Sequence, residues 1–142
     1  MSTKGLEILD HNVQLTHAWI NELDVMLGWN DRTRTFRLLR VTLQTLRDVL
    51  PLGETADFAA QLPTLLRGVF YEHWRPAAPK ISHRDRDYFF TRINGAFRTD
   101  PFDDVGDAVS IVFAFLSRKI SAGEIGEMRQ SMPEELRSLW PQ

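Results

Sequence analysis

Apolar residues recur along this chain at spacings of three and four, the period of an α-helix, and predict an all-α fold. The densest apolar stretch is Val105 to Ile120, where apolar residues lie nearly all round a helix. A helix of this kind is buried on most of its sides, so we expect it at the centre of the core. This stretch is too short to span a membrane, because a membrane-spanning helix needs about 20 apolar residues.

The N-terminal part of the chain predicts four helices, over about 13–27, 31–50, 54–61 and 63–74. The segment from Met1 to His11 is expected to be a mobile lead-in to the first of them. Asn30 is the expected N-cap of the second helix, because its side-chain oxygen can accept a bond from a free backbone N–H. Pro51 and Pro63 are expected to separate the helices, because proline cannot continue a helix from within.

A linker of residues 75–81 is expected next, since it holds two prolines and has no periodicity. The following helix is expected to begin at Ser82, which has the spacing of a capping motif. Asp100, followed by proline, is the expected cap of the buried helix. Two shorter helices then complete the chain, the first beginning at Ser121 and the second ending at Trp140.

The second half of the sequence repeats the first at a constant shift of 70 residues. The pairs that carry this alignment are Gly53 with Gly123, Glu54 with Glu124, Pro63 with Pro133, and Arg67 with Arg137. We therefore expect one all-helical domain over residues 1–142, with an internal repeat of 12–74 and 82–142 and the linker at 75–81. Each repeat has about four helices and is too small to bury much surface alone, so the two halves are expected to share a core.

The segment LGETADFAAQLPTLLRGVFYEHWRP, followed by an aromatic helix and a second Gly-Glu then MPEELRSLW, resembles the DUF2267 family of bacterial proteins. The resemblance covers nearly the whole chain and includes the repeat. It implies an all-helical, cytoplasmic bacterial protein. The family is one of unknown function, so the resemblance supplies no catalytic residues. In the second copy, Ser131-Met132 stands in place of Gln-Leu.

The composition narrows the function classes. Hydrophobic residues make up 43% and charged residues 25% of the chain, the net charge is −2, and there is no cysteine. Disulfides, thiol catalysis and thiolate metal sites are excluded, and no excess of positive charge favours nucleic acid or an anionic membrane. The N-terminus has no signal-peptide pattern, so a cytoplasmic protein is expected. A protein partner and a homodimer are both compatible with the sequence.

We expect no catalytic residue set, no cofactor and no metal site. His11 and His17 are not spaced to share one helical face. The aspartates between residues 100 and 107 lack the glycine and terminal glutamate of an EF-hand loop and are expected to be helix caps. The phosphate-binding, dinucleotide-binding and nucleophile-elbow patterns are missing from the sequence.

The repeated residues have expected structural roles. Gly53 and Gly123 are expected to form turns, and Glu54 and Glu124 to stabilise the N-termini of the helices that follow. An acid–base role for the two glutamates would require the structure to bring them close together. Pro63 and Pro133 are helix breaks. Arg67 and Arg137 are expected to bond carbonyls at helix C-termini or the two glutamates.

Two groups of side chains are candidates for binding. The first lies where a helix runs into the linker and consists of Tyr71, His73, Trp74 and Arg75, with Glu72 among them. The alternative is that its aromatic residues only pin the linker to the core. The second is a basic stripe on the polar face of the second helix, formed by Arg37, Arg40 and Arg47.

The sequence favours a non-catalytic interaction or regulatory module that offers the basic stripe to an acidic or protein partner. The first alternative is a small-ligand-binding protein with an aromatic pocket between the halves. The residues expected to line that pocket are Tyr71, Trp74, Tyr88 and Phe89. The second alternative is an enzyme of unknown reaction that assembles carboxylates, His73 and arginines across the repeat.

Overall fold

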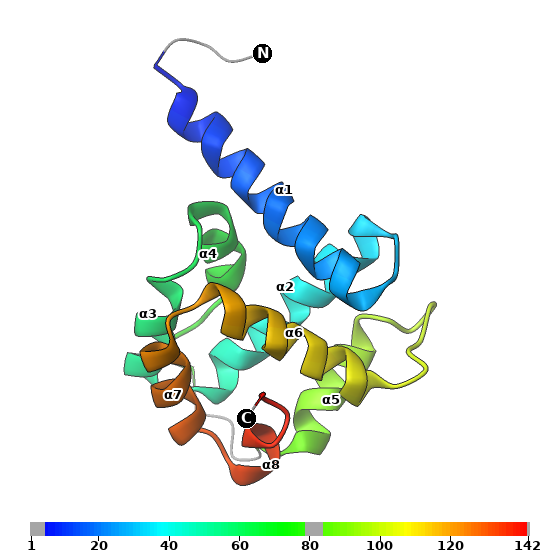
Figure 1. The fold of residues 1–142 in the computed structure, drawn as a ribbon. Helices are drawn as coiled ribbons and strands as arrows, with labels where there is room; N and C mark the ends of the chain where they lie inside the picture. Colours follow the sequence, from blue (N-terminus) through cyan, green and yellow to red (C-terminus); the bar gives the residue numbers. More distant parts are fainter. Residues whose placement is uncertain (1–4, 79–83, 142) are drawn as a thin grey trace.

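The computed structural model describes residues 5–78 and 84–141, and over these residues it contains eight helices and no strand, which confirms the all-α prediction (Figure 1). The helices are α1 (Glu7–Leu27), α2 (Arg32–Val49), α3 (Leu52–Ala59), α4 (Thr64–Tyr71), α5 (Arg86–Gly95), α6 (Val105–Lys119), α7 (Ala122–Gln130) and α8 (Glu134–Arg137). No helix in these two ranges is both long enough and apolar enough to cross a membrane.

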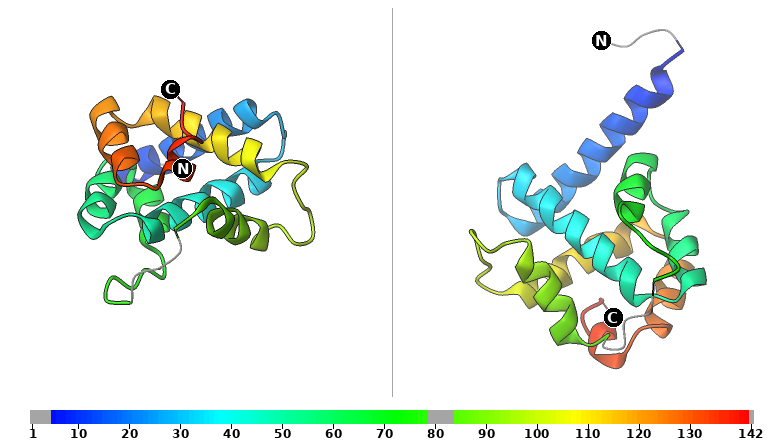
Figure 2. Two further views of the ribbon diagram at one scale, coloured as in Figure 1. Left: turned by 90° about the horizontal axis from the view of Figure 1, so that it is seen from below. Right: turned by 180° about the vertical axis from the view of Figure 1, so that it is seen from behind.

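The core lies between α2 and α6. Helix α2 packs against α1, α4, α5 and α6, and helix α6 packs against α1, α2 and α5. Six residues of α6 are buried, as the apolar pattern predicts: Ala108, Val109, Val112, Phe113, Phe115 and Leu116. The N-terminal half of α1 extends away from this body (Figure 1 and the right view of Figure 2).

Two predicted helix caps are wrong by one and by four residues. Asp31, not Asn30, caps α2, and its Oδ1 accepts a hydrogen bond from Arg34 N–H at 3.1 Å. Asn30 has a φ of 52°, a left-handed conformation that does not suit an N-cap. Asp104, not Asp100, caps α6. The side chain of Asp100 is instead hydrogen-bonded to arginines on α2.

Several helix ends also differ from the prediction. Helix α1 begins at Glu7, so the lead-in expected up to His11 is already helical there. Helices α4 and α8 end earlier than expected, at Tyr71 and Arg137. After α4, Glu72 has a ψ of 128°, outside the helical region, whereas α8 is followed by turns that reach Trp140. Gly53 and Gly123 lie inside the first turns of α3 and α7, and neither makes the turn expected before the helix.

The segment between α4 and α5 is described in part. Residues 75–78 of the expected linker lie outside the helices, whereas Ser82 and the rest of the linker fall outside the described residues. Helix α5 begins at Arg86 and is capped by Asp85, whose Oδ1 accepts a hydrogen bond from Tyr88 N–H at 2.8 Å.

Helix boundaries recur at the shift of 70 residues. The matching boundaries are the ends of α2 and α6 at Val49 and Lys119, the starts of α3 and α7 at Leu52 and Ala122, and the starts of α4 and α8 at Thr64 and Glu134. The internal repeat is a claim about how residues 12–74 and 82–142 superimpose, and it stays a prediction.

Candidate functional site

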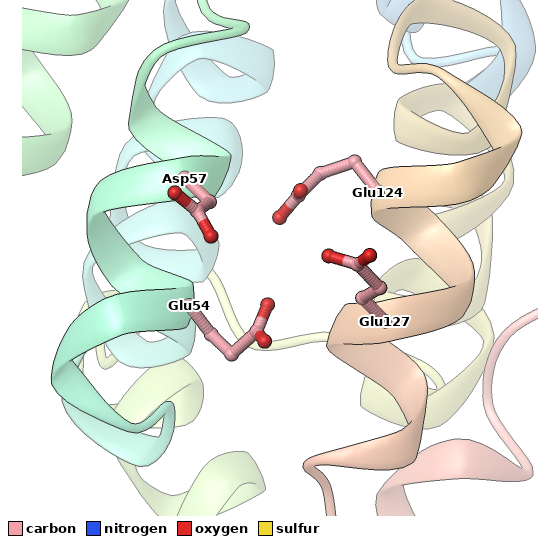
Figure 3. Close-up of side chains that lie close together, drawn as sticks. All are labelled: Glu54, Asp57, Glu124 and Glu127. Carbon is pink, nitrogen blue, oxygen red and sulfur yellow. The ribbon is translucent and has the colours of Figure 1, made fainter.

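Helices α3 and α7 pack against each other, and four carboxylates meet between them (Figure 3). Glu54 and Asp57 project from α3, and Glu124 and Glu127 project from α7 (Figure 3). One carboxylate oxygen of each residue lies within 4.8 Å of one oxygen of every other. We call these four residues the acidic quartet.

The sequence places both pairs by the same local rule. Residues three positions apart lie on one face of a helix, so Glu54 and Asp57 share a face of α3, as Glu124 and Glu127 share a face of α7. The residues beside them point inward and fix the rotation of each helix. Those inward residues are Phe58 and Ala59 on α3, and Ile125 and Met128 on α7, all of them buried.

A pair of hydrogen bonds joins the two helices next to the quartet. Gln61, just after α3, donates from Nε2 to Ser121 Oγ at 3.0 Å and accepts from Ser121 N–H at 2.9 Å. Ser121 is the N-cap of α7, and its Oγ accepts from Glu124 N–H. The C-terminal end of α3 therefore meets the start of α7, and the two helices run in opposite directions (Figure 3).

Glu124 is the most buried member of the quartet. Only 7% of its surface is exposed, and its Oε1 has no hydrogen-bond partner among the described residues. Oε2 of Glu54 is also buried without a partner in that part of the chain. A buried polar atom left without a partner costs about 1–3 kcal/mol, and more when the group is charged. One oxygen of each carboxylate is therefore buried without a bond from any described residue.

The electrostatic surroundings of the quartet are unfavourable to its charge. Burial raises the pKa of Glu124, and the nearby charges of Glu54, Asp57 and Glu127 raise it further. Burial likewise raises the pKa of Glu54, and the negative charges of Glu127 and Asp57 raise it further. Within residues 5–78 and 84–141, no ion pair includes any member of the quartet.

The donor set suits a hard divalent cation. Ca²⁺ and Mg²⁺ take oxygen ligands, whereas structural zinc sites use sulfur and nitrogen. Oxygens that surround Ca²⁺ lie about 2.3–2.6 Å from the ion, so opposite ligands are about 4.6–5.2 Å apart. The four oxygens of the quartet all lie within 4.8 Å of one another, which is no farther apart than opposite ligands of Ca²⁺ can be. Mg²⁺ holds its ligands at about 2.0–2.1 Å in a strict octahedron and usually keeps several waters, so a site of four protein carboxylates suits it less well.

The basic stripe is not a single exposed face. Arg47 is 7% exposed, and its Nη1 donates to the carbonyls of Phe70 at 2.9 Å and Glu72 at 2.8 Å. Arg37 bonds Asp100, and Arg40 is exposed. Arg47 thus holds the C-terminal end of α4 against α2, a role that its polar position on the helix did not reveal.

The aromatic cluster lies beside a cavity. The rings of Tyr71 and Trp74 stack at 5.1 Å, and His73 adopts a φ of 64°. The cavity has a volume of about 260 Å³, and its lining includes His73, Trp74 and Arg75 together with Arg47 and Thr55.

The rest of the predicted aromatic pocket lies elsewhere. Neither Tyr88 nor Phe89 lines this cavity. Phe89 is buried against Phe113, and the Tyr88 hydroxyl accepts a hydrogen bond from Arg92 at 2.8 Å. Of the binding group Tyr71, His73, Trp74 and Arg75, the last three line this cavity. The cavity differs from the expected aromatic pocket, because Trp74 is the one residue of that pocket in its lining.

The repeated arginines and prolines have structural positions. Arg67 donates to the carbonyls at and just after the C-terminal end of α3, which belong to Ala59, Ala60 and Leu62. It therefore bonds carbonyls and not Glu54. Pro63 and Pro133 immediately precede α4 and α8. Arg137 is exposed at the end of α8.

Sequence reasoning singled out Glu54 and Glu124 but missed Asp57 and Glu127. The expectation of no metal site considered the absence of cysteine, the histidines and the aspartates of residues 100–107, but not these four carboxylates. A usable signal was present: a carboxylate follows each Gly-Glu pair after three residues, and the two carboxylates are 70 residues apart.

Fold and site together define an all-helical protein with a carboxylate centre between two short helices. Residues 16–139 match the family model described as Uncharacterized conserved protein (DUF2267). The chain belongs to this family, as the resemblance indicated. The comparison with curated proteins gives no match.

Proposed function

We propose that this protein is a non-catalytic regulatory module that binds a divalent cation of the size of Ca²⁺ at the acidic quartet. The observation that carries the proposal is Glu124, which is buried within the quartet and has an oxygen, Oε1, without a partner in the described chain. A cation bound there would satisfy this oxygen and its counterpart on Glu54 at once. The cytoplasmic bacterial setting implied by the family resemblance belongs to the same proposal.

Charge repulsion supports a bound cation. Two like charges at about 4 Å repel by about 1 kcal/mol in water and about 4 kcal/mol at the effective dielectric constant near a protein surface. The quartet brings four carboxylates into this range, and two of them, Glu54 and Glu124, are partly or fully withdrawn from water. A divalent ion turns the mutual repulsion into attraction to a shared centre, which is why clustered carboxylates are characteristic of Ca²⁺ sites.

Isothermal titration calorimetry on chelator-treated protein tests the proposal. We expect one site for Ca²⁺ per chain and weaker binding of Mg²⁺, because four protein carboxylates suit its strict octahedron less well. The variant Glu124→Gln should weaken Ca²⁺ binding by at least about tenfold, since it removes one charged ligand. Glu72→Gln changes an exposed glutamate outside the quartet and should bind as the unaltered protein does. Failure of Ca²⁺ to bind, or equal loss in both variants, would contradict the proposal.

A second candidate function is small-ligand binding in the cavity beside Trp74. The observation that favours it is the convergence of His73, Trp74 and Arg75 on a cavity of about 260 Å³. Basic side chains next to an indole suit a small carboxylate with a planar apolar part. We expect aromatic carboxylates to raise the melting temperature, and Arg75→Gln to abolish this shift while Arg40→Gln preserves it. A panel of such acids that produces no shift would remove this candidate.

Of the basic stripe, Arg40 is the residue that we propose to contact a partner, because it is exposed. Arg37 and Arg47 already bond Asp100 and the end of α4. A pull-down that compares the unaltered protein with Arg40→Glu tests whether this position contacts a partner. Recovery of the same proteins by both would show that it does not.

A further inference from the structure

We infer that the cation at the acidic quartet acts as a latch that holds α3 against α7, and that its removal opens this end of the molecule. The inference rests on the proposed cation site and adds a regulatory consequence to it. It follows from where the quartet lies: all four ligands come from two short helices, with two on each.

Helices α3 and α7 are each short and bounded by breaks in the helical backbone. Pro51 precedes α3 and Pro63 follows the turn after it; Ser121 caps α7, and Pro133 follows the turn after that helix. Proline lacks the N–H that would continue a helix, so rotation at these points breaks no long helix. Among the described helices, α7 is the main neighbour of α3.

Helices α3 and α7, which carry the quartet, also carry buried apolar side chains. Phe58 on α3 and Met128 on α7 are fully buried, and Ile125 and Met132 are nearly so. The ring of Phe58 also packs on Phe70 of α4 at 5.5 Å. Separation of α3 from α7 would expose these side chains to water, and an apolar surface exposed under one condition alone is a suitable contact for a partner protein.

Two opposed forces act across this interface when the cation is absent. Apolar contact and the Gln61–Ser121 hydrogen bonds hold the helices together. Repulsion among the four carboxylates pushes them apart, and the buried oxygens of Glu54 and Glu124 gain hydration when they separate. A cation that binds ligands from both helices favours only the closed arrangement, so it shifts the population toward it.

Hydrogen–deuterium exchange of the full chain in EDTA and in saturating Ca²⁺ tests the latch. We expect amides of residues 52–61 and 122–131 to exchange at least about tenfold more slowly with Ca²⁺, because local opening is suppressed. Amides in the middle of α2 and α6 should be unaffected. A dye that fluoresces on apolar surfaces should bind more strongly in EDTA.

The double variant Glu54→Gln/Glu124→Gln tests whether repulsion among the carboxylates is what opens the interface between α3 and α7. It should exchange slowly in α3 and α7 with or without Ca²⁺, because the charge that opens the interface is gone. The single variant Asp57→Asn should lie between this variant and the unaltered protein, and Glu72→Gln should match the unaltered protein. Retained protection in α2 and α6 checks that each variant is folded.

The outcomes distinguish the two proposals. Calorimetric binding of Ca²⁺ without any change in exchange of α3 and α7 overturns the latch and leaves the cation site standing. Rapid exchange of the double variant in EDTA also overturns it, since repulsion would then not be the cause. Absence of Ca²⁺ binding overturns both.

Discussion

Arg37 Nη1 lies 2.8 Å from Oδ1 of Asp100, which ties α2 to the loop between α5 and α6. Arg34 adds a second bond from Nε to Oδ2 of the same carboxylate at 3.2 Å, and its Nη2 donates to the Asp100 carbonyl at 3.1 Å. The guanidinium of Arg34 also lies 3.9 Å from the centre of the Trp29 ring. Asp100, which the sequence predicts to be a helix cap, thus joins two segments that are far apart in the chain.

This anchor should make stability depend on pH in acid. The hydrogen bond from Arg37 holds the pKa of Asp100 below its ordinary value of 3.8, with burial opposing and Arg34 assisting. A carboxylate with a lowered pKa stabilises the folded state above its unfolded pKa, and this contribution is lost as the pH falls through the folded pKa. In urea denaturation, Asp100→Asn should be less stable than the unaltered protein at pH 7, and the difference should shrink below about pH 4. Asp103→Asn, an exposed neighbour, should show no such difference.

The acidic quartet should produce the opposite pH dependence in the absence of cations. Burial raises the pKa of Glu124 and of Glu54 above the ordinary value of 4.5, and their neighbours add to the effect. Between 4.5 and the raised folded pKa values, the folded state binds more protons than the unfolded state, so stability rises as the pH falls through those pKa values toward 4.5. In EDTA, Glu54→Gln/Glu124→Gln should be more stable than the unaltered protein at pH 7, and the two should converge on acidification. A gap that widens toward pH 5 would contradict this assignment.

Arg47 should contribute to stability far more than Arg40, although both are arginines of α2. Arg47→Met leaves the carbonyls of Phe70 and Glu72 without their donor, and should lower the free energy of unfolding by about 2–4 kcal/mol. Arg40→Met removes an exposed side chain whose one aromatic contact is with Phe36 at 5.9 Å, and should cost at most about 1 kcal/mol. Chemical denaturation of both variants measures the difference. Similar losses would show that Arg47 is not the clasp between α2 and α4.

Trp140 should be as important as any residue of the central helix. It is 2% exposed, and its ring stacks on Phe113 at 4.0 Å with an angle of 8°. Trp140→Ala should lower the free energy of unfolding by about 3–5 kcal/mol, as expected for loss of a buried aromatic residue. Leu65→Ala, at an exposed position of α4, should change it by no more than about 0.5 kcal/mol. Thermal unfolding of the two variants gives the comparison.

Periodicity was sufficient to predict the helices, because burial of one face determines where apolar residues fall. It did not locate the caps. Asn30 and Asp31 have similar capping side chains and differ here in backbone conformation, which adjacent turns determine. Asp100 satisfies the local rules for a cap as well as Asp104 does. Only the arginines of α2, more than 60 residues earlier in the chain, decide between them.

The sequence predicts which carboxylates share a helix face, but not that the two faces meet. Each Gly-Glu pair and the carboxylate three residues later lie in the sequence, and the helical period places them on one face. No local rule states that α3 and α7 meet, so the quartet needed the structure. Burial of Arg47 was hidden in the same way, because its partners belong to the end of α4.

The position of Trp140 has a consequence for synthesis of the protein on the ribosome. Helices α1 to α4 can form as they emerge, but the face of Phe113 on which Trp140 stacks stays uncovered until Trp140 leaves the exit tunnel. Until Trp140 has emerged, this apolar face of α6 is therefore open to water, and chaperones would encounter it there.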